Sequence, residues 1–150
     1  MPHISKNKLA YFDYKILETL EAGLVLTGPE VKSVKKGQIN LKGSYVTIRN
    51  NEAWLINCHI SPYKMAQREQ RNYDPTQPRK LLLKRKEIDR LVGQAKTPGL
   101  TILPLNVYTK NRLIKLEIGV GKGKKKFDKR DLIKKREIAK KIQRVLRQKI

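Results

Sequence analysis

The sequence predicts a mainly β protein, a small antiparallel β-barrel with two or three peripheral helices and a basic, flexible C-terminal tail. Three observations lead to this prediction. Two segments alternate apolar and polar residues on either side of a turn, short helical patterns separate the strands, and the composition changes sharply after Gly121. A chain of 150 residues suits one domain that buries its own core.

The first predicted hairpin covers residues 44–60, SYVTIRNNEAWLINCHI. Its alternating apolar positions flank the turn and are Val46, Ile48, Trp54 and Ile56. The turn is expected at Asn50-Asn51, because asparagine tolerates the positive φ of a tight hairpin turn. An earlier strand is expected within residues 15–28, ending at Gly28-Pro29.

The second predicted hairpin covers residues 100–120, LTILPLNVYTKNRLIKLEIGV. Its apolar positions include Ile102, Val107, Leu113, Leu116 and Ile118. The turn is expected near Lys110-Asn111. Proline cannot donate a hydrogen bond to a neighbouring strand, so Pro104 indicates either an edge strand or a bulge.

Two helices are expected between these strands, over residues 29–37 and 85–94. Pro29 suits a first helical position and Gly37 suits the C-cap of the first helix. Residues 61–79 are polar and rich in proline, which predicts a long loop. With five or six strands in all, the barrel is closed or half-closed, and the oligonucleotide-binding type is one common solution at this size.

The tail, residues 122–150, is expected to form a separate unit from a domain over residues 1–121. The last 30 residues contain fourteen Lys or Arg and three Asp or Glu, or half of the net charge of +22. From Leu132 onward, apolar residues recur with a helical period among the basic ones. An isolated helix this short is marginal in water. We therefore expect a tail that is disordered when free and helical against a partner.

Enzymatic chemistry finds little support in the sequence. One cysteine, Cys58, and two histidines are too few soft ligands for a zinc site, and Cys58 next to His59 indicates strand packing. The stretch GVGKGK, residues 119–124, lacks the spacing of a phosphate loop and is expected to be a flexible basic linker. No cofactor or metal is expected, and the protein is predicted not to be an enzyme.

A net charge of +22 indicates a polyanionic partner. Two basic groups lie on the body, and they are Lys32, Lys35 and Lys36 near one helix and Arg79, Lys80, Lys84, Arg85 and Lys86 near the other. Six tyrosines are interleaved and can stack on bases; they are Tyr11, Tyr14, Tyr45, Tyr63, Tyr73 and Tyr108. The alternatives are another housekeeping RNA-binding protein, such as a ribosomal one, a membrane-associated basic helix and a nuclease.

Four stretches make the sequence resemble a known family. They are EAGLVLTGPEVKSVKKG, SYVTIRNNEAWLINCHISPY, DPTQPRKLLLKRKEIDRLVG and GKGKKKFDKR. Their order and spacing are similar to those of the bacterial SsrA-binding protein family, SmpB. The resemblance covers the chain from about Asn7 to Arg136.

The resemblance implies a β-barrel of oligonucleotide-binding type that binds transfer-messenger RNA (tmRNA, or SsrA RNA) at its tRNA-like domain. It implies delivery of that RNA to the stalled 70S ribosome for trans-translation, with the tail against ribosomal RNA in the decoding site and the empty mRNA channel. Alanyl-tRNA synthetase and elongation factor Tu are implied as indirect partners. A cytoplasmic location without a membrane is expected.

The resemblance also implies site residues. The RNA-binding positions of the family correspond to Glu21 in E-A-G, Leu82 in R-K-L-L-L and Lys115 in K-L-E-I-G. The family's D-K-R element of the ribosome-binding tail corresponds to Asp128, Lys129 and Arg130. Phe127 precedes them where the family often has His or Tyr. The chain departs from the family's basic N-terminal segment at Leu9 and Tyr11.

Overall fold

The computed structural model describes residues 3–66, 71–124, 133–134 and 136–144. Its helices are α1 (Lys8–Asp13), α2 (Gly28–Lys35) and α3 (Arg85–Lys96), with a short 3₁₀ helix at Lys64–Ala66. Its strands are β1 (His3–Lys6), β2 (Tyr14–Leu24), β3 (Ile39–Asn40), β4 (Tyr45–Arg49), β5 (Glu52–Ile56), β6 (His59–Ile60), β7 (Arg79–Leu82), β8 (Leu100–Lys110) and β9 (Leu113–Gly123).

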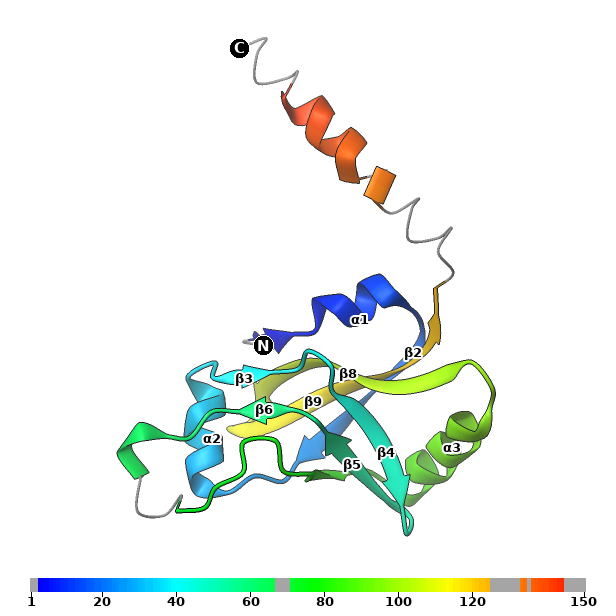
Figure 1. Cartoon of the computed structure of the whole chain (residues 1–150). Coiled ribbons are helices and arrows are strands. Elements are labelled where there is room, and N and C mark those ends of the chain that lie inside the picture. The colour runs from blue at the N-terminus through cyan, green and yellow to red at the C-terminus, as the bar shows by residue number, and fades with distance from the viewer. Residues whose placement is uncertain (1–2, 67–70, 125–132, 135, 145–150) are drawn as a thin grey trace.

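Seven strands form one antiparallel sheet in the order β1-β8-β9-β2-β7-β5-β4, and β3 pairs with β6 separately. The sheet curls so that β4 packs across β8, with α3 against both (Figure 1). The end strands β1 and β4 do not pair with each other in the described residues. The predicted mainly β fold with peripheral helices is thus confirmed, and the sheet is curled without being closed by hydrogen bonds among the described residues.

The first predicted hairpin is β4–β5. Asn50 and Asn51 have φ of 52° and 59°, as a tight turn with two left-handed residues requires. Val46 pairs with Leu55 and faces the core, so the inward residues of β5 are Ala53 and Leu55. Trp54 and Ile56 lie on the opposite face of the strand and are half-buried.

The second predicted hairpin is β8–β9, with its turn at Asn111 and Arg112, one residue later than expected. The register shifts between Pro104 and Asn106, so Pro104 marks a bulge that leaves Leu105 as the extra residue. The edge alternative also holds locally, because β1 pairs with β8 only over residues 106–108 and Pro104 lies outside that pairing, with β9 as its strand neighbour.

Both predicted helices are present, and the first turn of α2 is capped from both sides. In α2, Thr27 and Glu30 form a reciprocal capping box: the Thr27 hydroxyl accepts from the Glu30 N–H and the Glu30 carboxylate accepts from the Thr27 N–H. The C-cap is Lys36, and Gly37, with φ of 79°, is the next residue, one position later than predicted. In α3, Leu91 is fully buried and fixes which side of the helix faces the core.

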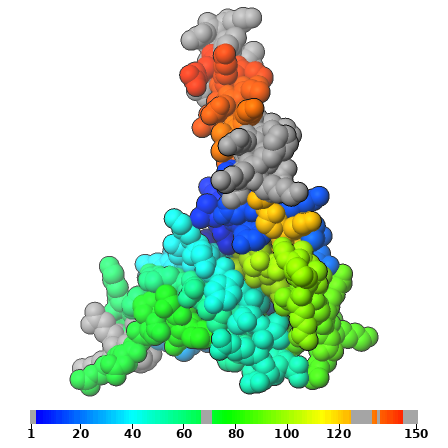
Figure 2. Space-filling model, turned by 45° about the vertical axis from the view of Figure 1, so that its right-hand side comes forward, coloured from blue at the N-terminus to red at the C-terminus, as the bar shows by residue number. Residues whose placement is uncertain are grey.

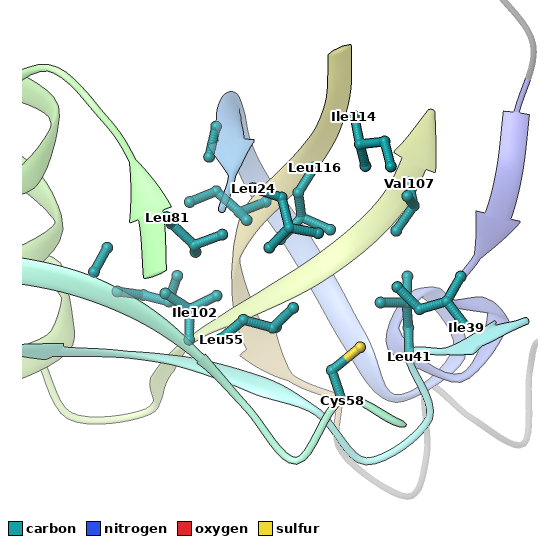
Figure 3. Close-up of a cluster of buried hydrophobic side chains, with 14 of the residues drawn as sticks. Leu24, Ile39, Leu41, Leu55, Cys58, Leu81, Ile102, Val107, Ile114 and Leu116 are labelled. Carbon is teal, nitrogen blue, oxygen red and sulfur yellow. The ribbon is translucent and has the colours of Figure 1, made fainter. Parts of the chain in front are cut away.

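The curled sheet encloses the main core. Inward side chains from β2, β5, β7, β8 and β9 meet the apolar residues around β3 and β6, and Figure 3 shows Leu24, Leu55, Leu81 and Leu116 pointing into this space. Cys58 is buried at one end of the cluster. Burial raises the pKa of its thiol to about 12, so the thiol stays protonated and packs as a small apolar group.

Strand β7 was not expected, and its first residue corrects one prediction. Arg79 is 2% exposed and lies inside the protein, so it does not belong to a basic surface. Its guanidinium binds the buried Glu30 carboxylate at 2.6 Å, the Cys58 carbonyl and the Pro75 carbonyl. The Tyr73 hydroxyl donates to Glu30 at 3.0 Å and completes the cluster.

Burial opposes the charge on Glu30, but the Thr27 N–H and the Arg79 guanidinium outweigh it and hold the pKa of Glu30 below its ordinary value. The cluster is therefore an ion pair at neutral pH. It joins α2, the chain after β5, the loop before β7 and β7 itself.

The prediction of a flexible linker over residues 119–124 is wrong at the start of the tail. Lys122 and Gly123 continue β9 and pair with Lys15 and Tyr14, so the stretch GVGKGK belongs to a strand up to that point. The Lys124 N–H also donates to the Asp13 carbonyl. Farther on, residues 136–144 are helical and exposed, and they lie away from the sheet in both Figure 1 and Figure 2.

We expect Arg79→Met to lower the free energy of unfolding by about 3–5 kcal/mol, because it leaves the Glu30 carboxylate buried without its counter-charge. Urea denaturation at pH 7 measures this. The control is Lys80→Met, the same change at the neighbouring residue, whose side chain is 42% exposed and whose pairing with Glu52 contributes little. Equal stability of the two variants would contradict a structural role for the pair.

Candidate nucleic-acid interface

The three predicted RNA-binding residues lie together on the outer face of the sheet. Gly23 on β2 is the register partner of Leu82 on β7 and of Lys115 on β9. Leu82, Gly23 and Lys115 therefore form one row across the three strands. Glu21 precedes Gly23 by two residues on β2 and therefore shares its face. Residues distant in the sequence are thus brought side by side by strand register.

Gly23 keeps this row open. A Cβ atom at this position would lie 3.2 Å from the Leu82 Cβ atom, tighter than ordinary van der Waals contact. The Leu82 side chain is 57% exposed, unusual for a leucine in the middle of a sheet. The result is an apolar platform beside a basic residue, a surface that suits an unstacked base next to its phosphate.

Glu21 is held in its charged form by its neighbours. The Tyr108 hydroxyl donates a short hydrogen bond to Glu21, and Lys110 pairs with it at 3.5 Å. The hydrogen bond from Tyr108, followed by the charges of Lys110 and Lys115, lowers the pKa of Glu21. Burial and this hydrogen bond raise the pKa of Tyr108, which therefore stays a neutral donor.

A second carboxylate lies directly across from Glu21. Glu117 on β9 is its register partner and accepts a hydrogen bond from the Asn106 amide at 2.9 Å and one from the Tyr11 hydroxyl at 3.4 Å. Neither Asn106 nor Glu117 was predicted from the sequence. The only signal for them was Pro104, because the bulge after this proline places Asn106 opposite Glu117 and Tyr108 opposite Lys115.

The other end of the outer face is covered by α1. Ala10 packs there on Leu103 and Leu105, with Tyr11, Tyr14 and Ile16 around them. Gly119 and Gly121 make room for this layer, because Cβ atoms there would lie 2.7 Å from Leu105 and 2.9 Å from Tyr14. The open part of the face is therefore the end that carries Glu21, Leu82 and Lys115.

The remaining predicted features divide between surface and interior. Lys80 stays near the surface opposite the half-buried Trp54, and Lys32 and Lys36 lie over the ring of Tyr63 at 5.5 and 5.0 Å. The hydroxyls of Tyr73 and Tyr108 are held by hydrogen bonds to Glu30 and Glu21, and Tyr108 is only 8% exposed, so its ring is not open for stacking. Phe127, Asp128, Lys129 and Arg130 lie outside the described residues.

Two further properties bear on the class of protein. The described residues contain no group of three His, Cys, Asp or Glu side chains that suits a metal ion. No helix in the described ranges has the length and hydropathy to cross a bilayer. A curled antiparallel sheet, a partly apolar and partly basic outer face and a charge of +22 are the features of a small nucleic-acid-binding β domain.

Comparison with known proteins gives the family within this class. The family model described as "SmpB protein" matches residues 4–148. The SsrA-binding protein of Gloeothece citriformis is 52% identical over 96% of this chain and 92% of its own, and that of Sulfurihydrogenibium sp. is 50% identical over 98% and 95%. The chain belongs to the SmpB family.

A solved structure gives the same result for the fold. It is described as "tmRNA-SmpB: a journey to the center of the bacterial ribosome", and it is 41% identical with a TM-score of 0.67. The match covers 81% of this chain and 85% of that one. The family that the sequence resembles is thus confirmed from both sequence and structure.

We expect Tyr108→Phe to raise the pKa of Glu21 toward its ordinary value, because the lost hydrogen bond is the largest of the effects that lower it. Carboxyl carbon NMR during a pH titration measures this pKa directly. Tyr45→Phe, on the distant strand β4, is the control and leaves Glu21 unchanged. An unchanged Glu21 in Tyr108→Phe would mean that the two side chains are not coupled.

Proposed function

We propose that this protein binds the tRNA-like domain of tmRNA and delivers that RNA to stalled ribosomes for trans-translation. The observation that carries this proposal is the row of Leu82, Gly23 and Lys115 beside Glu21 on the open outer face of the sheet. Membership of the SmpB family and the likeness to a tmRNA–SmpB structure support it.

Leu82, Lys115 and Glu21 each have a distinct role in this proposal. Leu82 packs against an unstacked base, and Lys115 neutralises a backbone phosphate. Glu21 accepts hydrogen bonds from base N–H groups, and Tyr108 and Lys110 keep its carboxylate charged and fixed in place for that purpose. Phosphate contacts supply affinity, while the contacts of Glu21 supply selectivity.

The proposed role of the tail, which the pairing of β9 restricts to the residues after Lys124, is on the ribosome. Its basic side chains contact ribosomal RNA in the decoding site and the empty mRNA channel, and Phe127, Asp128, Lys129 and Arg130 form the element that acts there. Release of counterions offsets the cost of ordering a helix in that channel. An intact message occupies the same channel, so competition between the two restricts the protein to stalled ribosomes.

The wider setting follows from this role. Alanyl-tRNA synthetase and elongation factor Tu act on the RNA to which the protein is bound, and are therefore indirect partners. The work is done in the cytoplasm, and the protein acts by binding, without catalysis. A general RNA-binding role is the alternative; it predicts similar affinity for all RNAs of one length.

We expect Glu21→Gln to weaken binding to the tRNA-like domain about tenfold, as loss of a good base contact does. General electrostatics predicts the opposite sign, because removing a negative charge strengthens attraction to RNA. Filter binding with competitor tRNA over a salt series measures both. Glu52→Gln, an exposed carboxylate on β5, is the matched control and binds as tightly as the wild type or slightly tighter. Identical behaviour of the two variants would leave charge as the only determinant.

Removal of the residues after Lys124 should leave binding of the tRNA-like domain nearly unchanged and abolish tagging on stalled ribosomes. The end point follows from the structure, since a cut after Gly121 also removes Lys122 and Gly123 from the pairing of β9 with β2. A reconstituted translation system with a message lacking a stop codon measures tagging. Tagging by the shortened protein would refute the proposed role of the tail.

A further inference from the structure

A hollow opens on the outer face beside Glu21, between β1, β8, β9 and β2. It is lined by His3, Thr19, Leu20, Glu21, Asn106, Tyr108 and Glu117. Four of these side chains, Glu21, Asn106, Tyr108 and Glu117, belong to the hydrogen-bonded group already described, and their polar atoms determine what the hollow can bind.

The hollow contains an arrangement that the fold itself does not need. Glu21 and Glu117 are direct register partners on neighbouring strands, and like charges in such positions repel each other. The chain has only 13 acidic residues against 35 basic ones, so two carboxylates opposite each other are unusual in this protein. Two opposed carboxylates are favourable when a hydrogen-bond donor lies between or above them.

Asn106 points to the same kind of ligand. It is 8% exposed, and its amide nitrogen donates to Glu117 and to the Tyr11 hydroxyl. Its carbonyl oxygen is buried and has no hydrogen-bond partner among the described residues. An acceptor of this kind is rare in a folded protein, and a donor on a ligand would satisfy it.

Within the hydrogen-bonded group, the polar atoms that remain for a ligand are acceptors, while the exposed His3 and Thr19 of the lining can donate or accept. The acceptors are the two carboxylates, the carbonyl oxygen of Asn106 and the oxygen of Tyr108, whose hydrogen is used by Glu21. Among the four RNA bases, guanine alone presents two adjacent donor groups, N1–H and the N2 amino group, on its Watson–Crick edge. Adenine and cytosine place a ring acceptor beside their amino group, and uracil has one N–H between two carbonyls.

The surroundings favour a nucleotide over a free cation. Lys110 pairs with Glu21 and Lys115 adds a second positive charge to the same carboxylate, so a cationic ligand meets repulsion while a phosphate is attracted. The apolar Leu82 and the flat surface at Gly23 lie on the same face.

We propose that this hollow receives one unpaired guanine of the bound RNA, and that Asn106 and Glu117 determine this specificity together with Glu21. The inference rests on the proposed function, since it names the base that the RNA-binding face reads. Asn106 and Glu117 accept the donor groups of the guanine edge, and Tyr11 holds the Asn106–Glu117 pair in place from the side of α1.

The test combines protein variants with altered RNA. Each unpaired guanosine of the tRNA-like domain is replaced in turn by inosine, which lacks the N2 amino group. We expect one replacement to weaken wild-type binding about tenfold. Glu117→Gln weakens binding of the unmodified RNA by a similar factor, and the same inosine then has no further effect, because both changes remove one interaction. Asn106→Ala behaves in the same way.

Matched controls separate this result from other causes. Glu52→Gln removes the same charge elsewhere and retains the full inosine effect. Glu117→Gln is isosteric and half-buried, and thermal unfolding verifies that it remains folded even if Asn106→Ala does not. If inosine and Glu117→Gln lowered the affinity for RNA independently and additively, the guanine site would be refuted. It would also be refuted if no inosine replacement changed the affinity of the wild type.

The outcomes also distinguish this inference from the proposed function. Tight, selective binding of the tRNA-like domain without coupling refutes the guanine site and leaves the proposed function standing. Failure of the wild type to prefer this RNA over tRNA refutes both. If Glu117→Gln leaves RNA binding intact and weakens ribosome binding instead, the hollow takes a cationic protein side chain, and the guanine site is refuted.

Discussion

The buried ion pair between Glu30 and Arg79 is the interaction on which the outer face depends. Arg79 begins β7, and its guanidinium also binds carbonyls at Cys58 and Pro75. Strand β7 is short and joins the two longer parts of the sheet, β2 and β5. The pair therefore positions Leu82, three residues later, next to Gly23. Desolvation makes such a pair costly to break, and the hydrogen bonds around it offset the cost of burial.

The sequence was most informative where structure is determined locally. The turn at Asn50-Asn51 and the first helix with Pro29 and Gly37 depend on residues close to one another in the chain, and both were predicted. Strand β7 was missed because its residues are embedded in a stretch dominated by Lys and Arg, which suggests a surface. Only the buried carboxylate of Glu30, 49 residues earlier, makes Arg79 an interior residue. Pairings of that kind are not visible in local patterns.

The candidate site was predictable only in part, and its predicted residues came from the family resemblance and not from local sequence patterns. Glu21, Leu82 and Lys115 were named from the family resemblance, and the register of three strands explains why they act together. Composition could not have found Asn106 and Glu117. Their contact depends on the position of a bulge, and Pro104 indicated that a bulge was possible without giving its register. The glycines of GVGKGK led to the wrong prediction of a flexible linker, because glycine-rich basic stretches are typical of linkers. In the structure, Gly119 and Gly121 lie beneath closely packed side chains.

The bulge at Leu105 reverses the alternation of inward and outward side chains along β8. Before it, Leu103 faces outward under α1 and Ile102 faces the core; after it, Val107 faces the core and Asn106 and Tyr108 face outward. The Asn7 side chain donates to the Pro104 carbonyl at 2.9 Å and so ties the irregularity to the start of α1. The apolar side chains along this stretch can be exchanged for others of similar size, but its length cannot change. Deleting or inserting one residue between Ile102 and Val107 would turn one half of the strand inside out, so in evolution this segment is constrained in the number of its residues more than in their identity.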